Sequence, residues 1–489
     1  MLHELKIVGC KEVVSNNIEE LCLLESINFS ILGLKSLSKE FMEGLAKVKN
    51  LKLDDCNELT SFWQDGLMSL VRLEIWSCNS LINICLTSTL KILNINGCGA
   101  LKSLPISNCT CLEYATIKKC SSLMFISKRQ LPPTLKRLEI KNCENLQFLI
   151  DEGEASSLLM KEESINSNAS LLEHLVIGDC PSLKCVLLKG DLFVKLKFLE
   201  IWSCSELTSL SSSKQLPIAL KGLEVRNCPK LESLADNLHS NASLECLTIS
   251  NCKEIKFLPE GLHKLYHLND IIILDCCSLV SFPDGGFLPT HLINLSIWYC
   301  EKLEALPRMH MVTTLWIYEC PSIVSLPEEG LPTNLKELRL GGMTICKQVF
   351  EWGLHRLSSL TRLTIFGDGF EGWQSFPEEE DGKMMLLLPT SLTYLLILDF
   401  PDIVFLSSKV FQNLSSLEQL WIWYCPKLAS LPENGLPPSL LQLQIYECPV
   451  LKQHCKKGKG QEWLKNIINI PYVKIDWRSI YELQEEEQQ

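Results

Sequence analysis

The feature that most constrains this chain is a pattern of apolar residues and one cysteine that returns at nearly constant spacing. From Cys180 the pattern's cysteines fall at Cys204, Cys228, Cys252, Cys276 and Cys300, a constant step of 24 residues. The copies have the form L-x-x-L-x-I-x-x-C-x-x-L-x-x-L-P. Self-similarity at a fixed period indicates an array of repeats that bury their apolar faces against their neighbours.

Eighteen copies are recognisable along the chain. Fifteen of them carry cysteine in the central slot, and three carry Met343, Asp368 or Phe400 there instead. The segment from Leu24 to Leu37 is interpreted as one further, eroded copy. Most steps lie between 20 and 25 residues, which matches the period of leucine-rich repeats.

The alternation within each copy predicts one short strand. In the copy around residue 75, Leu73 and Ile75 point inward while Glu74 and Trp76 point outward. Because every copy coils the same way, neighbouring strands must run parallel. The return segments are rich in Leu-Pro and serine, which do not propagate a helix. We therefore expect an α/β leucine-rich-repeat solenoid, a horseshoe with a parallel concave β-sheet and a convex side of mostly loops and short 3₁₀ turns.

The repeat register also explains most of the cysteines. Fifteen of the 24 occupy the slot where the strand ends, and a small weak donor suits a narrow space beside backbone carbonyls. Regular packing of this kind and the lack of a secretion signal favour free thiols in a reducing cytoplasm. No zinc-type pairing, catalytic triad or phosphate loop is apparent, so we expect no metal, no cofactor and no enzymatic activity.

Charge and hydropathy narrow the possible partners. The formal net charge is −12, and the lysines and arginines are dispersed along the chain, which argues against nucleic acid as a partner. No stretch reaches the roughly 20 apolar residues that a membrane span requires. A protein partner is therefore expected.

A column of outward residues offers candidate partner-binding positions. The residue after each strand's last inward isoleucine is aromatic in seven of sixteen copies, against 8% aromatic residues in the whole chain. Strand propensity and cross-strand stacking would explain this enrichment, and so would anchoring of a protein interface. The predicted docking site consists of Trp298, Trp316, Tyr318, Trp421, Trp423 and Tyr446.

The chain is expected to divide into a solenoid over residues 1–451, a C-terminal cap over 452–477 and an acidic tail over 478–489. The cap prediction rests on Trp463, Ile467, Ile470 and Trp477, which would cover the last repeat. Two irregular stretches should project as loops. They are the 37-residue step from Cys143 to Cys180, and residues 367–391 with their acidic run from Glu378 to Asp381.

Several strings resemble plant intracellular disease-resistance proteins of the nucleotide-binding leucine-rich-repeat type, in the group that carries a coiled coil. They are LLLPTSLTYL (386–395), FPDIVFLSS (400–408), CPKLASLPENGLPPSL (425–440) and CPVLKQHCKKGKGQEW (448–463). The resemblance covers residues 1 to 477 in repeat style. It implies that the repeats sense a pathogen effector or a modified host protein. It also implies that they restrain the nucleotide-binding domain of a parent receptor, whose phosphate-loop motif this chain does not contain.

Two other classes of leucine-rich-repeat protein stay open from the sequence. A substrate-recruiting module of a ubiquitin ligase also uses cysteine-containing repeats, but no F-box or catalytic domain is visible. An extracellular receptor would carry asparagine in the slot and a Gly-x-Ile-Pro element, and both are absent.

Overall fold

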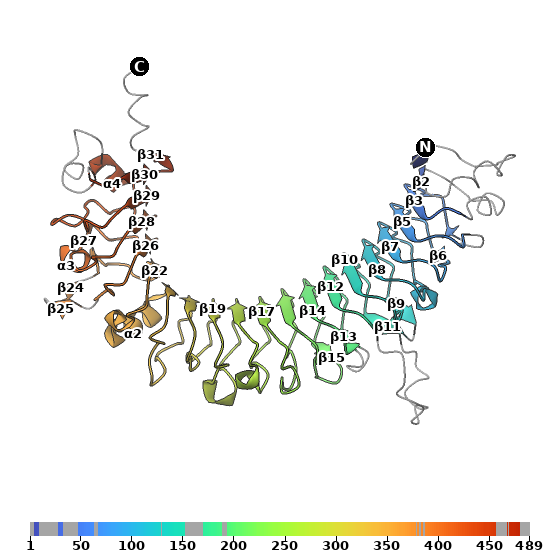
Figure 1. The fold of residues 1–489 in the computed structure, drawn as a ribbon, viewed down its shortest axis with the longest axis horizontal. Coiled ribbons are helices and arrows are strands. Elements are labelled where there is room, and N and C mark those ends of the chain that lie inside the picture. The colour runs from blue at the N-terminus through green and yellow to red at the C-terminus, as the bar shows by residue number, and fades with distance from the viewer. Residues whose placement is uncertain are drawn as a thin grey trace, which may run out of the picture. The chain divides into compact units, whose positions relative to one another are not determined.

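A computed structural model describes most of the chain. The described residues are 4–8, 28–32, 47–62, 67–128, 130–151, 170–187, 193–377, 379–380, 383–384, 387–455, 467 and 469–479; for 4–8, 28–32, 379–380 and 383–384 only the backbone is described. The chain forms two compact units, Met1–Leu265 and Tyr266–Gln489, which are described separately. Figure 1 shows the strands of each unit as a ladder with return segments behind it.

The first unit is built on a row of short parallel strands, one per repeat. Successive strands pair in register, so that Leu73 on one strand lies beside Leu93 on the next. The second strand, in the eroded copy, pairs with the strands on both sides and confirms that copy as a repeat. The strands are β1 (Glu4–Val8), β2 (Asn28–Leu32), β3 (Asn50–Asp54), β5 (Arg72–Trp76), β7 (Ile92–Asn96), β8 (Tyr114–Lys118), β10 (Arg137–Lys141), β12 (His174–Gly178), β14 (Phe198–Trp202), β16 (Gly222–Arg226) and β17 (Cys246–Ser250).

The second unit continues the same construction and adds helices. Its strands pair parallel and in register from β18 to β30, and a final short strand runs antiparallel. The strands are β18 (Asp270–Leu274), β19 (Asn294–Trp298), β20 (Thr314–Tyr318), β21 (Glu337–Leu340), β22 (Arg362–Phe366), β26 (Tyr394–Leu398), β28 (Gln419–Trp423), β29 (Gln442–Tyr446), β30 (Tyr472–Ile475) and β31 (Arg478–Ser479).

The return segments consist of loops and short 3₁₀ turns, as predicted. They also contain two kinds of element that the sequence did not predict. The 3₁₀ turns are η2 (Ile106–Asn108), η5 (Leu262–Lys264), η6 (Asp284–Gly286) and η7 (Leu354–Arg356). The first addition is a set of helices, α2 (Met343–Trp352), α3 (Ser408–Phe411) and α4 (Pro449–His454). The second is a set of short parallel pairs, β4 (Ser61–Phe62) with β6 (Asn83–Ile84), β9 (Phe125–Lys128) with β11 (Phe148–Asp151), β13 (Cys185–Leu187) with β15 (Ser209–Ser211), and β23 (Ser375–Phe376) with β27 (Phe405–Leu406).

The slot cysteines lie in the core, as their spacing predicts. Cys252 and Cys300 are fully buried, and their thiols donate to the carbonyls of Ser250 and Trp298 at 3.4 and 3.5 Å. The same thiol-to-carbonyl bond, two residues back, recurs in both units at 3.3 to 3.6 Å. The weak donor of cysteine thus satisfies a carbonyl at the strand end.

The residue before the slot turns the chain. It adopts a left-handed backbone in most copies, with φ of 53° at Ser77, 51° at Asn251 and 54° at Tyr299. This conformation favours Asn, Asp and Gly. In this position the backbone N–H of Ser77 donates to the carbonyl of Asn96 in the next repeat. The turn therefore extends the inter-repeat ladder by one hydrogen bond.

Two of the three predicted substitutes for the slot cysteine are wrong. Met343 begins helix α2 and is half-buried, while Cys346 of that helix is fully buried. Asp368 is half-buried and accepts a hydrogen bond from the Tyr318 hydroxyl, and Phe370 enters the core two residues later. The third substitute, Phe400, is completely buried as predicted.

The C-terminal end continues the main sheet. β30 pairs parallel with β29, and Ile467, Ile470 and Val473 are buried. Residues 456–466, including Trp463, and the tail from 480 lie outside the described residues, so the cap and tail boundaries stay predictions. The same holds for residues 152–169 of the first predicted loop. In the second loop, β24 (Glu379–Glu380) and β25 (Lys383–Met384) form an antiparallel pair, while Glu378 and Asp381 are outside the described residues.

The burial of the thiols predicts a two-class labelling pattern. Burial raises the pKa of Cys98 to about 11 and that of Cys109 to about 12, so at pH 8 both stay protonated and shielded. Cys85, Cys111 and Cys246 are exposed. We expect a maleimide reagent to modify these three within minutes in the native protein and all 24 cysteines after unfolding, as read by peptide mass mapping. Equal labelling rates for Cys98 and Cys85 would contradict the described core.

Candidate protein-binding surface

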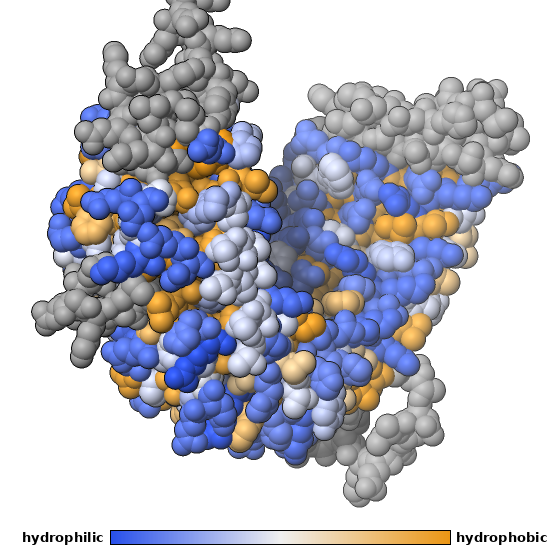
Figure 2. Space-filling model, turned by 60° about the vertical axis from the view of Figure 1, so that its left-hand side comes forward, coloured by the Kyte–Doolittle hydropathy of each residue, from blue (hydrophilic) through white to orange (hydrophobic). Residues whose placement is uncertain are grey.

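The outward residues of the second unit form the predicted column. Trp298 lies beside Tyr318 in the strand register, and Leu398, Trp423 and Tyr446 are aligned on three successive strands. All six predicted docking residues lie on this outward sheet face and are half-buried. In Figure 2, pale residues of intermediate hydropathy, the class that includes tryptophan and tyrosine, gather among blue and orange ones on the side that comes forward.

The six residues fall into two aromatic clusters. In the first cluster, Trp298 lies 6.2 Å from Trp316 and 5.6 Å from Tyr318 between ring centroids. Tyr318 also packs edge-on against Phe366 at 4.7 Å, because Gly341 on the intervening repeat has no side chain to separate them. The first cluster consists of Trp298, Tyr299, Trp316, Tyr318 and Phe366.

The second cluster lies on the last three repeats of the unit. The rings of Trp421 and Trp423 stack at 5.2 Å with an interplanar angle of 18°. Trp477, predicted only as a cap residue, packs against Trp423 and Tyr446 and is 56% exposed. The second cluster consists of Tyr394, Trp421, Trp423, Tyr424, Tyr446 and Trp477.

Two arginines extend the aromatic surface. The guanidinium of Arg339 lies 3.9 Å from the ring centre of Trp316, and that of Arg362 lies 4.2 Å from the ring centre of Tyr394. Both arginines also pair with the carboxylate of Glu337. Such cation–π contacts hold the rings in place and bridge the space between the clusters.

The indole N–H groups of this surface lack hydrogen-bond acceptors. Among the described residues, the Nε1 atoms of Trp298, Trp316, Trp421 and Trp423 are covered by neighbouring atoms and have no acceptor. Tyrosine and tryptophan usually find a polar partner when their polar atom is buried. Because these four N–H groups are covered, it is the half-buried ring faces, and not the N–H donors, that this sheet face offers to a partner.

The first unit shows that these aromatics are not needed to build the sheet. Besides Trp76 and Trp202, it carries charged side chains at equivalent outward positions, with Glu139 between Lys118 and Lys141 at 3.0 and 2.8 Å. Arg226 and Glu224 form another pair on the same face at 2.8 Å. The backbone pairing is the same in both units, so the difference lies only in what each face presents. Both interpretations of the aromatic column thus remain compatible, since the rings do stack on one another.

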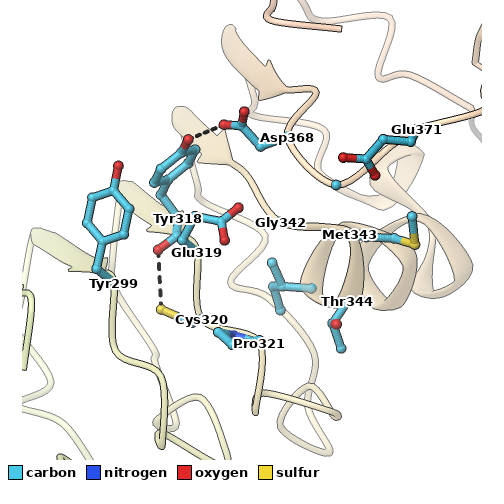
Figure 3. Close-up of a pocket in the computed structure, with 12 residues that line it drawn as sticks. Tyr299, Tyr318, Glu319, Cys320, Pro321, Gly342, Met343, Thr344, Asp368 and Glu371 are labelled. Atoms are coloured by element: carbon cyan, nitrogen blue, oxygen red, sulfur yellow. Dashed lines mark hydrogen bonds between the residues drawn. The ribbon is translucent and has the colours of Figure 1, made fainter. Parts of the chain in front are cut away.

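A pocket opens beside the first cluster, and the sequence pattern did not predict it. It has a volume of about 480 Å³ and is lined by Tyr299, residues 318–321, residues 342–345, and Asp368, Gly369 and Glu371. Figure 3 shows the carboxylates of Glu319 and Glu371 on opposite sides of the opening, the carboxylate of Asp368 at the Tyr318 hydroxyl, and the start of helix α2 on the far side. Its residues come from four successive turns of the solenoid, those of β19, β20, β21 and β22, which explains why no single motif marks it.

The electrostatics of the pocket are one-sided. The lining holds three carboxylates and no lysine or arginine. Partial burial and the nearby Asp368 raise the pKa of Glu319, and the same two causes raise the pKa of Asp399 next to the pocket. Burial and the hydrogen bond to Asp368 raise the pKa of Tyr318. Negative charge is therefore concentrated here without a neutralising side chain in the lining.

Part of the chain is similar in sequence to known plant proteins. Residues 87–229 match the family model described as plant disease resistance protein RPS2-like, leucine-rich repeats. This part of the chain is therefore similar to the leucine-rich repeats of plant disease-resistance proteins. This chain is also 34% identical over 184 residues to a putative disease resistance protein of Arabidopsis thaliana, covering 36% of this chain and 12% of that protein.

Two further similarities were found. A protein of Arabidopsis thaliana named for variation in compound triggered root growth response is 38% identical over 100 residues, covering 20% of this chain and 8% of its own length. The matches thus span only a small part of these relatives. Among solved structures, YopM from Yersinia enterocolitica covers 91% of this chain and 78% of its own at 19% identity, with a TM-score of 0.44.

Among the described residues, no group of three or more histidine, cysteine or acidic side chains could hold a metal ion. Within the same part of the chain, every helix is too short or too polar to cross a bilayer.

Proposed function

We propose that this chain is a non-catalytic recognition domain of plant innate immunity that binds a protein, either a pathogen effector or a modified host protein. The observation that carries the proposal is the aromatic sheet face of the second unit. It presents two clusters of half-buried tryptophan and tyrosine rings, on a chain whose repeats are similar to those of plant disease-resistance proteins. Tryptophan and tyrosine are the residues that most often anchor protein interfaces.

The proposal has a regulatory part and a location. In a parent receptor of this type, the repeats would restrain a nucleotide-binding domain until the partner occupies the sheet face. The whole process would take place in the cytoplasm, where the buried slot thiols stay reduced. Similarity to a putative disease resistance protein over 184 residues supports the role in resistance from which both parts are proposed.

The docking site can be tested with single alanine variants once a partner has been selected, for example by two-hybrid screening of effector and host libraries. We expect Trp316→Ala and Trp423→Ala each to weaken binding by about 2 kcal/mol or more, roughly 30-fold in Kd, because both rings would be buried by the partner. Titration calorimetry measures the affinity. The thermal midpoint of each variant shows whether the loss comes from binding or from folding.

A matched control is available in the first unit. Trp202 has an equivalent outward position and packs under the ammonium of Lys141 at 4.9 Å, but it belongs to a charged face. Trp202→Ala should leave the affinity unchanged. Unchanged affinity across Trp298, Trp316, Tyr318, Trp421, Trp423 and Tyr446 would refute the docking site, and the rings would then serve only to stabilise the strands.

A further inference from the structure

We propose that the acidic pocket beside the first aromatic cluster receives an arginine side chain of the protein partner, with the neighbouring aromatic sheet face packing against the residues around that arginine. This inference rests on the proposed protein-binding function and adds the chemistry of the partner. It predicts a basic residue as the anchor of the bound segment.

Shape supports a side-chain ligand. The pocket volume of about 480 Å³ falls within the roughly 300–1,000 Å³ of small-ligand sites, so it accepts a long side chain together with water. Tyr299 and Tyr318 form one wall, with their rings in edge contact at 5.2 Å. A guanidinium that enters along this wall can lie against a tyrosine ring and reach the carboxylates beyond it.

Charge complementarity favours a positively charged ligand. Glu319, Asp368 and Glu371 line the opening, and no basic side chain lines it. An anion would have to overcome the field of all three carboxylates, although the start of helix α2 also faces the pocket. A cation relieves their mutual repulsion, and the planar fork of arginine can bind two carboxylate oxygens at once. The formal net charge of −12 for the whole chain also favours the approach of a basic partner.

Continuity with the aromatic surface links the pocket to a protein rather than to a free metabolite. Tyr318 belongs to both features, since its ring packs on Trp298 and Phe366 while its hydroxyl donates to Asp368. Trp298 and Trp316 lie in the same cluster, and their half-buried rings offer flat apolar surface to the peptide segment around the arginine.

The test uses the whole chain and argininamide, which presents the arginine side chain without a carboxylate. We expect saturable binding of argininamide, measured by saturation-transfer NMR and titration calorimetry. Citrulline amide keeps the shape and the α-ammonium group but has a neutral ureido group in place of the guanidinium, and it should bind at least tenfold more weakly. The double variant Glu319→Gln/Asp368→Asn should weaken argininamide binding at least tenfold.

Two controls keep the result interpretable. Glu351→Gln removes an exposed carboxylate from the far end of helix α2 and should leave binding unchanged. If the double variant melts early, Glu371→Gln, at an exposed position of the rim, replaces it and should weaken binding at least threefold. Equal binding of citrulline amide, no argininamide binding at all, or binding that survives the pocket variants would overturn the proposal.

Failure of this inference is distinguishable from failure of the proposed function. The argininamide titration needs no partner, whereas the Trp316 and Trp423 variants are measured with one. If partner binding depends on those tryptophans but argininamide does not bind, only the proposed arginine anchor is refuted. If argininamide binds in the pocket but the tryptophan variants leave the partner affinity unchanged, only the proposed aromatic docking site is refuted.

Discussion

Replacing Phe400 by alanine is expected to destabilise the second unit by about 3–5 kcal/mol, the usual cost of removing a fully buried aromatic side chain. Phe400 fills the slot that cysteine occupies elsewhere and is completely buried. Its ring lies 5.3 Å from Phe376 and 5.6 Å from Phe370, so its loss opens a cavity between two turns of the return side. Gly367 lies directly against the Phe400 backbone, which limits how far the chain can collapse into that cavity.

The control for this variant is another phenylalanine in the same repeat. Phe405, on β27, is 43% exposed, so Phe405→Ala should change stability by about 0.5 kcal/mol or less. Urea unfolding followed by hydrogen exchange would report both the size of the effect and its location. Equal losses for the two variants, or exchange that rises only in the first unit, would contradict the described packing of Phe400.

Replacing the slot cysteine Cys252 by aspartate should destabilise the first unit by at least about 3 kcal/mol. The site is completely buried, and a carboxylate placed there loses its hydration without gaining a cationic partner. It would also face the carbonyl of Ser250, to which the thiol donates at 3.4 Å. Cys252→Asn should cost clearly less, because the side-chain amide can donate to the same carbonyl.

Cys246 supplies the matched control, because it lies on β17 in the same repeat and is exposed. Cys246→Asp should leave the unfolding midpoint nearly unchanged, since its carboxylate stays in water. Comparison of the three midpoints separates the effect of charge from the effect of side-chain volume. A Cys252→Asp protein as stable as Cys246→Asp would show that the slot is open to solvent.

The sequence predicted the repeating part of the fold well, because alternation along a strand and the 24-residue step each have a direct physical meaning. It failed where one copy uses a different element. Met343 was assigned to the slot by spacing, but Ile345, Cys346, Val349 and Phe350 have a helical period and fill the core from α2. That period was a readable signal. At Asp368, a charged residue in an otherwise apolar slot indicates that the chain departs from the repeat pattern.

The candidate site was predictable only in part. Strand alternation placed Trp298, Trp316, Tyr318, Trp421, Trp423 and Tyr446 on one face, and the structure has them there. It could not reveal the contacts of Trp477 or the acidic pocket, because these bring together residues from different repeats, such as Trp477 with Trp423 and Asp368 with Tyr318. Spacing predicts which way a side chain points, whereas a cavity depends on how the return segments of several repeats pack.

The strand register has a consequence for how such a chain can change over generations. Lys141, Gly178, Trp202 and Arg226 occupy equivalent backbone positions on neighbouring strands, held by the same main-chain bonds whatever side chain they carry. Exchange of one outward residue for another therefore alters the surface shown to a partner and leaves the scaffold intact. A single substitution on this face can therefore change which partner surface fits it, without a compensating substitution in the core.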